Sequence, residues 1–240
     1  MSGLELKKLA LYQLGFTDLE VPDNWSATIT YASGDSVAYN GVEYTSSAGS
    51  NLNNIPTSGA PWSEGSALSQ ESLIVNEVYE EQSEYVAQEY NWNIFSAISA
   101  LGTPTTLTSE RYKYSYELPD DWKRNINIFQ DVYRRIPITD FEIDEVNMLI
   151  KCNTNNNIYI EYLYFDRDTF ADNLPMNFKS YFKYVLAHNL CLSLVGDEKL
   201  ELKLIELAKR AKLQAYSRDT KNVKVRRIAS CDRYNVLRVY

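Results

Sequence analysis

Residues Arg111 to Arg124 read RYKYSYELPDDWKR and decide how the middle of this 240-residue chain folds. Tyr112, Tyr114 and Tyr116 alternate with polar residues, and a period of two is typical of a half-buried strand. Pro119 ends that strand because proline has no N–H to donate to a neighbouring strand. The segment lies between two long helical stretches, and strand-like sequence follows it. The pattern predicts an α+β protein in which an aromatic hairpin packs against helices.

Helical patterns flank this segment on both sides. Apolar residues recur three and four positions apart in four stretches, which predicts helices over about residues 4–14, 68–101, 175–195 and 197–216. Strands are expected at 144–152 and 158–165, on either side of an Asn-rich loop. The predicted fold class is therefore α+β and mainly helical. A helix-bundle core would comprise residues 1–22 and 67–216 and would contain a β-hairpin region at 110–165.

Residues 23–66 interrupt this core and predict a small inserted all-β module. The stretch is rich in Ser, Gly, Asn and Thr, and it has no Lys or Arg. Its segment SVAYNGVEYTS predicts two strands joined by Asn40-Gly41, a pair that favours a type I′ turn because both residues must adopt positive φ. So small a module needs stacked aromatic rings for its stability. The rings available as apolar anchors, or for stacking on sugars, are Trp25, Tyr31, Tyr39, Tyr44 and Trp62.

Charge is distributed unevenly along the chain, whose formal net charge is −8. Residues 64–101 contain Glu but no Lys or Arg, whereas residues 199–240 are strongly basic. Three interpretations are open: solvated faces, complementary faces on neighbouring subunits, or a weaker nucleic-acid signal. Residues 217–240 predict an extended basic tail that either docks on a partner or folds back on its own subunit. The candidate interface residues of this tail are Lys221, Lys224, Arg226, Arg227, Arg233 and Arg238.

The chain lacks the residue patterns of common catalytic and metal sites. Its one histidine, His188, lies in an apolar helix, and its three cysteines are too far apart for a zinc site. The acidic pairs Asp120-Asp121 and Asp166/Asp168 are typical of turns and loops. The sequence therefore predicts a protein that is not an enzyme, with no catalytic residue, no cofactor and no metal. It also has no apolar run long enough for a membrane span, so no membrane partner is expected.

The inserted module resembles the carbohydrate-binding modules of family 5/12, in which exposed aromatic rings stack on sugars. The resemblance is carried by Trp25, Tyr31, the stretch Gly34 to Tyr44, Pro56 and Trp62. Chitin-binding members have a pair of tryptophans after the hairpin, where this chain has Ser46-Ser47-Ala48. Sugar binding and a structural or protein-docking role both remain open for the module.

The rest of the chain resembles the head-to-tail connector, or tail tubular protein A, family of short-tailed bacteriophages. The matching order begins with LELKKLALYQLG, a long second helix ending YNWNIFSAISAL, and the tyrosine strand with its Leu-Pro-Asp-Asp corner. It continues with IYIEYLYFD, LPMNFKSYFKYVLAHNLCLSLVGD, a last helix and an extended tail. The abundance of Tyr and Asn, with a module after the first helix, is also similar to ring proteins of crAss-like phages.

This second resemblance implies a structural role in the virion at the head-to-tail junction, after assembly in the host cytoplasm. The implied partners are eleven further copies in a ring of twelve, the portal protein, the next tail ring or hub, and double-stranded DNA that passes through the lumen without specific recognition. The alternative function is a carbohydrate-binding surface or adhesion module carried on a helical scaffold.

Overall fold

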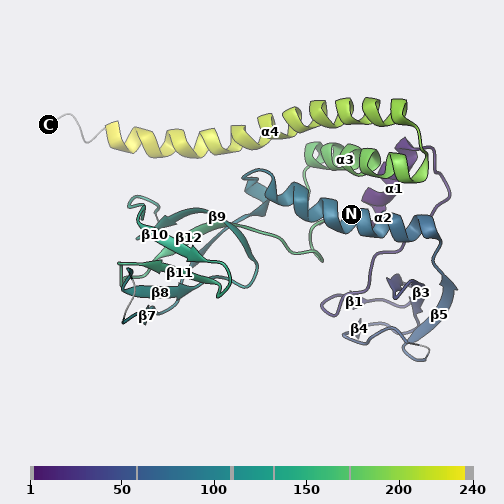
Figure 1. The fold of residues 1–240 in the computed structure, drawn as a ribbon, viewed down its shortest axis with the longest axis horizontal. Helices are drawn as coiled ribbons and strands as arrows, with labels where there is room; N and C mark the ends of the chain where they lie inside the picture. The colour runs from purple at the N-terminus through teal and green to yellow at the C-terminus, as the bar shows by residue number, and fades with distance from the viewer. Residues whose placement is uncertain (1–2, 58, 109–110, 132, 173, 236–240) are drawn as a thin grey trace. The chain divides into compact units, whose positions relative to one another are not determined.

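The computed structural model describes residues 3–57, 59–108, 111–131, 133–172 and 174–235, with side chains described as far as residue 220. These residues form four α-helices and twelve strands, with 35% of residues in helix and 26% in strand. The strands build four separate sheets. The expectation of a mainly helical, helix-bundle protein is therefore wrong, and the fold is mixed α+β (Figure 1). The chain divides into two compact units, residues 1–85 with 167–240, and residues 86–166.

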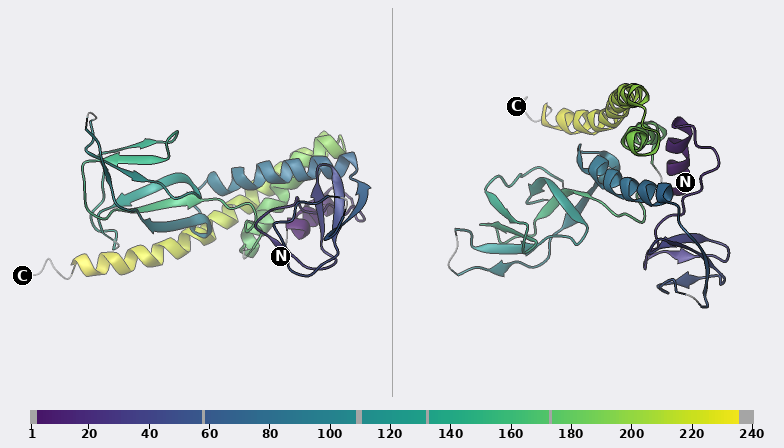
Figure 2. Two further views of the ribbon diagram at one scale, coloured as in Figure 1. Left: turned by 90° about the horizontal axis from the view of Figure 1, so that it is seen from below. Right: turned by 45° about the vertical axis from the view of Figure 1, so that its right-hand side comes forward.

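Helices form the core of the first unit. Within it α3 and α4 lie side by side, and Figure 2 shows the pairing from two further directions. The side of α4 that packs on α3 carries buried residues at helical spacing, namely Leu204, Ala208, Ala211 and Ala215. We call this side the alanine face, because its three alanines let the two helices approach closely. The helices are α1 (Gly3–Gln13), α2 (Gln70–Gln88), α3 (Met176–Leu194) and α4 (Glu198–Asn235).

The connection between α3 and α4 follows local rules that the sequence displays. Gly196 adopts a φ of 70°, which is the left-handed conformation that commonly ends a helix. Its N–H donates to the Cys191 carbonyl at 3.0 Å. The Asp197 carboxylate then accepts from the backbone N–H groups of Lys199 and Leu200 at 2.9 and 3.1 Å, which caps the start of α4.

The basic C-terminal segment continues α4 and is not an extended tail. Helix α4 runs to Asn235, so the expectation of an extended chain is wrong for residues 217–235. The sequence contains no Gly or Pro after Gly196, and without a breaker the helix propagates. The alternation of Val with charged residues near Lys224 is also typical of extended strands, but β propensity depends strongly on context.

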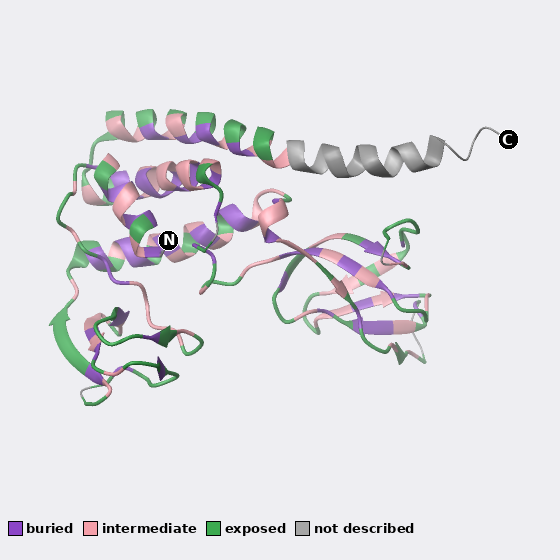
Figure 3. Ribbon diagram, turned by 180° about the vertical axis from the view of Figure 1, so that it is seen from behind, coloured by how far each residue is buried: buried purple, intermediate pink, exposed green. Residues whose placement is uncertain are grey.

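A cluster of aromatic rings joins α2 to α3. The Tyr79 ring of α2 lies edge-on to Phe182 of α3, with ring centroids 5.7 Å apart. Phe170, in the segment before α3, contacts both rings at 6.4 and 5.1 Å. Tyr79, Phe170 and Phe182 are all buried. This packing places α3 between α2 and α4 within the unit (Figure 3).

The inserted module belongs to the same unit and is all-β. Its hairpin joins β2 to β3 through Asn40 and Gly41, whose φ values are 50° and 79°. Both values are positive, so the predicted type I′ turn is confirmed. The module has a three-stranded sheet in the order β2-β3-β5 and a two-stranded sheet of β1 and β4. Its strands are β1 (Thr30–Tyr31), β2 (Ser36–Tyr39), β3 (Val42–Ser46), β4 (Asn51–Leu52) and β5 (Trp62–Ala67).

The second unit consists of two antiparallel sheets that share one buried core. One sheet has the order β6-β12-β9 and the other the order β10-β11-β8-β7. Core side chains come from both, including Tyr116 and Ile150 from one and Ile128 and Ile160 from the other. The strands are β6 (Ser96–Ala100), β7 (Thr105–Thr106), β8 (Tyr114–Glu117), β9 (Trp122–Phe129), β10 (Phe141–Asp144), β11 (Leu149–Cys152) and β12 (Tyr159–Tyr164).

Two sequence-based expectations fail in this unit. The tyrosine strand β8 and the strand after the Pro-Asp-Asp corner, β9, belong to different sheets, so the corner is a crossing between sheets and not a hairpin turn. The helix predicted as far as Leu101 ends at Gln88, and Ser96–Ala100 forms a strand paired with β12. In both cases a distant strand supplies the pairing, which no local pattern reveals.

Candidate functional site

Three of the five aromatic residues singled out in the module form its interior, and the other two pack against them. Tyr31, Tyr44 and Trp62 are buried, with Tyr31 and Trp62 in edge-on contact at 5.3 Å. The Trp62 indole N–H donates to the Asn54 carbonyl at 2.8 Å. Trp25 and Tyr39 are half-buried and edge-on to each other at 5.6 Å. The buried rings of Tyr31, Tyr44 and Trp62 are therefore not available for stacking on a sugar.

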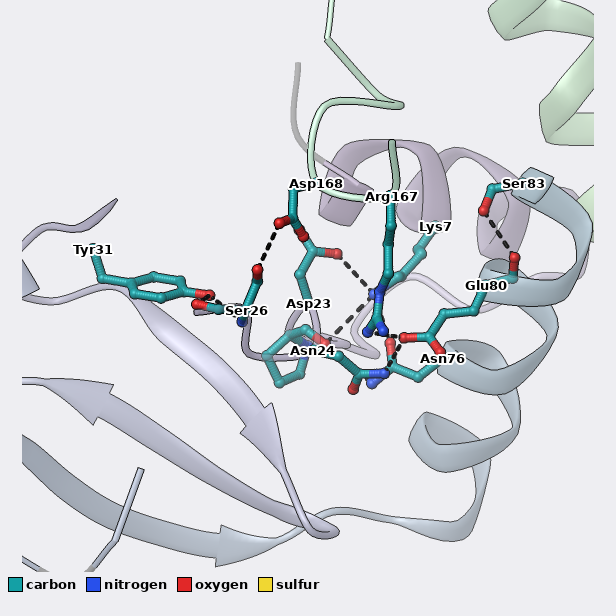
Figure 4. Close-up of polar contacts among 11 residues, drawn as sticks. Lys7, Asp23, Asn24, Ser26, Tyr31, Asn76, Glu80, Ser83, Arg167 and Asp168 are labelled. Carbon is teal, nitrogen blue, oxygen red and sulfur yellow. Dashed lines mark hydrogen bonds and ion pairs between the residues drawn. The ribbon is translucent and has the colours of Figure 1, made fainter. Parts of the chain in front are cut away.

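A polar cluster ties the first segment of the module to the helices, and Figure 4 shows its members. At its centre is Lys7 of α1, which is only 1% exposed. The Lys7 ammonium lies 2.8 Å from Asp23 Oδ1 and donates to Asn76 Oδ1 of α2 at 2.5 Å. The Pro22 carbonyl lies 3.5 Å away. The buried charge is therefore paired and hydrogen-bonded, as a buried lysine must be to remain charged.

Asp23 also fixes the start of α1. Its Oδ2 accepts from the Leu4 backbone N–H at 3.2 Å, which satisfies one of the free donors at the helix N-terminus. A Cβ on Gly3 would lie 2.7 Å from Asp23 Oδ1 and 2.9 Å from the Tyr79 hydroxyl oxygen. Only glycine allows Asp23 to approach α1 so closely. One carboxylate thus holds the helix end, the buried lysine and the beginning of the module.

Two further carboxylates extend the cluster to α2 and to the segment before α3. Glu80 of α2 accepts from the Asn24 amide and forms an ion pair with Arg167. Asp168 accepts from the hydroxyls of Ser26, at 2.6 Å, and Thr28. Residues from four separate stretches of the sequence therefore meet at the base of the module.

Burial controls the electrostatics of this cluster. Burial lowers the pKa of the Lys7 ammonium, and the Asp23 carboxylate opposes that effect. Burial also raises the pKa of the Tyr79 hydroxyl, and the charge of Asp23 adds to the increase. A small cavity of about 60 Å³ lies among these side chains. Its volume is large enough for a few water molecules.

Asp121 and Asp168, from the acidic pairs that sequence analysis assigned to turns and loops, accept hydrogen bonds. Asp121 accepts from the Tyr162 hydroxyl at 3.0 Å, and Asp120 lies in the corner between β8 and β9. Asp168 belongs to the cluster just described. Across the described residues there is no group of three or more His, Cys, Asp or Glu that could hold a metal ion.

The single histidine, His188, lies on α3, where burial lowers its pKa. Among the described residues, no helix combines the length and the apolar character needed to cross a membrane. The predicted interface residues of the C-terminal segment are mostly on the last turns of α4. The side chains of Lys221, Lys224, Arg226, Arg227 and Arg233 lie outside the described part, as does the whole of Arg238.

Sequence analysis missed the polar cluster. One signal was present: Lys7 falls on the same helical face as Gly3, Ala10 and Leu14, where an apolar residue is expected. A lysine at such a position indicates a buried charge that needs a partner. The identity of the partners, Asp23 and Asn76, depends on how distant segments pack.

Comparisons with known proteins give no family for the chain. No protein-family model matches it, and no curated protein matches it. Among solved structures, a crystal structure of a chitinase C mutant is similar over 29% of this chain and 25% of that one, with 27% identity and a TM-score of 0.19. The chain thus spans a quarter of that chitinase, and a similarity so limited carries no argument about function.

Proposed function

We propose that the protein is a structural virion subunit that forms a head-to-tail connector ring, docks on the portal and extends the DNA channel toward the tail. The observation that carries the proposal is the order of elements. A short first helix precedes the inserted module, and a long second helix leads to a β unit with the Leu-Pro-Asp-Asp corner. Two paired helices then end the described chain. The resemblance to phage connectors implies this order of elements, with two differences: α2 ends at Gln88, and α4 continues through residues expected to be an extended tail.

A ring of identical subunits needs a heterologous contact that repeats until it closes. The helical unit has complementary charged surfaces for such a contact, because the exposed side of α2 is acidic and that of α4 is basic. Twelve copies, matched to the portal, are the number that the resemblance implies. DNA would pass through the lumen without recognition of its sequence, so the function needs no catalytic residue and no cofactor.

The inserted module fits a structural or protein-docking role better than sugar binding. Its Tyr31, Tyr44 and Trp62 rings are buried inside the module. Its first segment is tied to α1 and α2 through Asp23 and Asn24. A module held in this way is a fixed projection on the helical unit.

Electron microscopy of the purified protein, alone and with the portal protein of its own virus, tests the proposal. We expect rings when the portal is present, and a monomer is an acceptable state without it. Mass measurement of the mixture should give an integral number of copies per portal ring. Only unbound monomer in the presence of the portal would contradict the proposal. Retention of that monomer on insoluble polysaccharide would favour an adhesion module instead.

A further inference from the structure

Helix α2 presents an acidic stripe on the side opposite its core contacts. The stripe consists of Leu73, Glu77, Glu81 and Tyr85, which follow one another at intervals of four residues and are all exposed. The opposite side of α2 is buried and includes Val75 and Tyr79. Residues four apart lie on one helix face. The two apolar residues of the acidic stripe therefore stand at its ends, with two glutamates between them.

Helix α4 presents a basic stripe of the same design. The stripe consists of Leu202, Lys209, Arg210 and Leu213, with Glu206 between the leucines. Leu202 and Leu213 are 66% and 68% exposed. They lie on the side opposite the alanine face that packs on α3, and Figure 3 shows α4 with one buried and one exposed side.

The two stripes match in length and in charge. At about 1.5 Å per residue, the apolar ends lie ~18 Å apart on the acidic stripe and ~16 Å apart on the basic one. The residues between them are Glu77 and Glu81 on α2. On α4 they are Lys209 and Arg210, with Glu206 paired to Arg210 on its own helix. Two helices laid together could place Leu73 and Tyr85 against the leucines and the glutamates near Lys209.

One chain cannot bring its own stripes together. Both belong to the first unit, in which α3 lies between α2 and α4. The buried side of α2 contacts α3 through Tyr79 and Phe182, and the buried side of α4 packs on α3 as well. Both stripes therefore point away from α3. A contact between an acidic and a basic stripe must therefore join two different copies of the chain.

We infer that the acidic stripe of one subunit packs against the basic stripe of the next, and that this contact joins neighbouring copies. The partner is a second copy of this chain. Because each copy carries both stripes, the contact is heterologous and can repeat around a ring. The inference deepens the proposed connector function and depends on it for ring closure, although pairing of the two stripes does not require a ring.

The size of the contact predicts weak pairing in isolation. A stripe about 18 Å long and about 10 Å wide covers roughly 180 Å², whereas a stable interface buries ~800 Å² on each partner. The stripes alone should therefore give a transient dimer. Stable association would need the remaining contacts of a closed ring or a template such as the portal.

Cross-linking of two single-cysteine variants captures a weak contact and tests its polarity. The variants are Glu81→Cys and Lys209→Cys, each in a Cys231→Ser background. The remaining thiols, Cys152 and Cys191, are buried, and burial raises the pKa of both, so they react slowly. A short bis-maleimide is added to equal mixtures, and cross-linked dimers are quantified on denaturing gels.

A heterologous contact requires that the mixed pair react best. The yield from Glu81→Cys with Lys209→Cys should exceed that of either variant alone by about five-fold or more. A matched control combines Lys209→Cys with Glu64→Cys, a glutamate exposed on the module and outside both stripes. Equal yields from the mixed pair, the single variants and the control would overturn the inference.

Charge reversal provides a second measurement on the same pair. Adding Glu77→Lys to the Glu81→Cys chain replaces attraction by repulsion and should lower the mixed yield several-fold, whereas Glu64→Lys should leave it unchanged. The difference should shrink in about 1 M salt, where the Debye length is about 3 Å. Rings on the portal without a preferred mixed cross-link would refute the contact between the stripes and leave the connector function standing. A preferred mixed cross-link without rings would support the contact between the stripes and count against the connector function.

Discussion

Lys7 shows how one residue can link three parts of the chain. Its ammonium is buried, whereas the Asp23 side chain beside it is 41% exposed. Water can therefore solvate part of the carboxylate but almost none of the ammonium. Removing a partner from a buried charge costs more than removing the charge itself, because the remaining ion is left without solvent.

This asymmetry predicts the order of two substitutions. Asp23→Asn leaves the buried Lys7 ammonium without its negative partner and replaces the charged acceptor of the Leu4 N–H by a neutral one. The free energy of unfolding should therefore fall by about 2–4 kcal/mol. Lys7→Met keeps most of the side-chain volume and leaves Asp23 with water and the Leu4 N–H, so its cost should be smaller. Urea unfolding of both variants measures the order. A larger loss for Lys7→Met would show that the lysine itself supplies the stability.

His188 gives the protein a dependence of stability on pH that can be isolated. Burial lowers its pKa from the ordinary value of 6.5, although the charge of Glu201 opposes the shift. The unfolded chain therefore binds a proton at a higher pH than the folded protein. The contribution of His188 to stability is fully present above pH 6.5, decreases as the pH falls through that value, and levels off below the folded pKa.

Replacing His188 by Gln removes this contribution. Thermal unfolding of the untagged protein and of His188→Gln should give parallel midpoints from pH 8 to pH 7. Between pH 6.5 and pH 5 the wild-type midpoint should fall faster than that of the variant. The comparison is clean because the chain has only one histidine. Parallel curves over the whole range would contradict a lowered pKa.

At the scale of the element, α4 has one face that packs inside its own unit and an opposite face that is exposed. The alanine face packs closely on α3, and the opposite face exposes Leu202 and Leu213. A substitution on one face should affect folding, and a substitution on the other should affect association. The two effects can be separated because the faces do not share residues.

Ala211→Leu and Leu213→Gln make a matched pair, two positions apart on α4. Ala211 is buried against α3, so a leucine there overpacks the contact and should destabilise the protein by ~1–3 kcal/mol. Leu213→Gln changes an exposed residue and should alter the stability of the monomer by less than about 0.5 kcal/mol. Chemical denaturation measures both. An equal loss for the two variants would show that Leu213 is part of the folded core.

At the scale of the whole molecule, the chain is a helical unit with an inserted module and a separate β unit. Each has its own buried residues, around Tyr79 and Phe182 in the helical unit, Trp62 in the module and Ile160 in the β unit. The module nevertheless depends on the helices, because Asp23, Asn24 and Ser26 connect its first segment to them.

Deleting the module tests this dependence. Replacement of residues 24–66 by a short Gly-Ser linker keeps Asp23 and its ion pair with Lys7. The helical unit should still fold, with a loss of ~1–3 kcal/mol for the missing Asn24, Ser26 and Thr28 hydrogen bonds. Extending the deletion to Asp23 should cost clearly more. Circular dichroism and thermal unfolding compare the two deletions, and an insoluble first deletion would show that the module is part of the core.

The features that the sequence determined are local. Asn40-Gly41 specifies a tight turn through the conformations that these two residues tolerate. Gly196 and Asp197 end one helix and cap the next through contacts within a few residues. The absence of Gly and Pro after Gly196 also indicates a continuous α4, although an extended tail was expected for residues 217–240.

Tertiary structure decided the rest because the partners are far apart in the chain. Ser96–Ala100 became a strand through pairing with β12, about sixty residues later. The Pro119 corner crosses between two sheets for the same reason. Lys7 and Asn76 form a hydrogen bond at the base of the module, although the sequence near either residue does not predict this contact. Such contacts depend on the packing of whole elements, which composition and periodicity constrain only weakly.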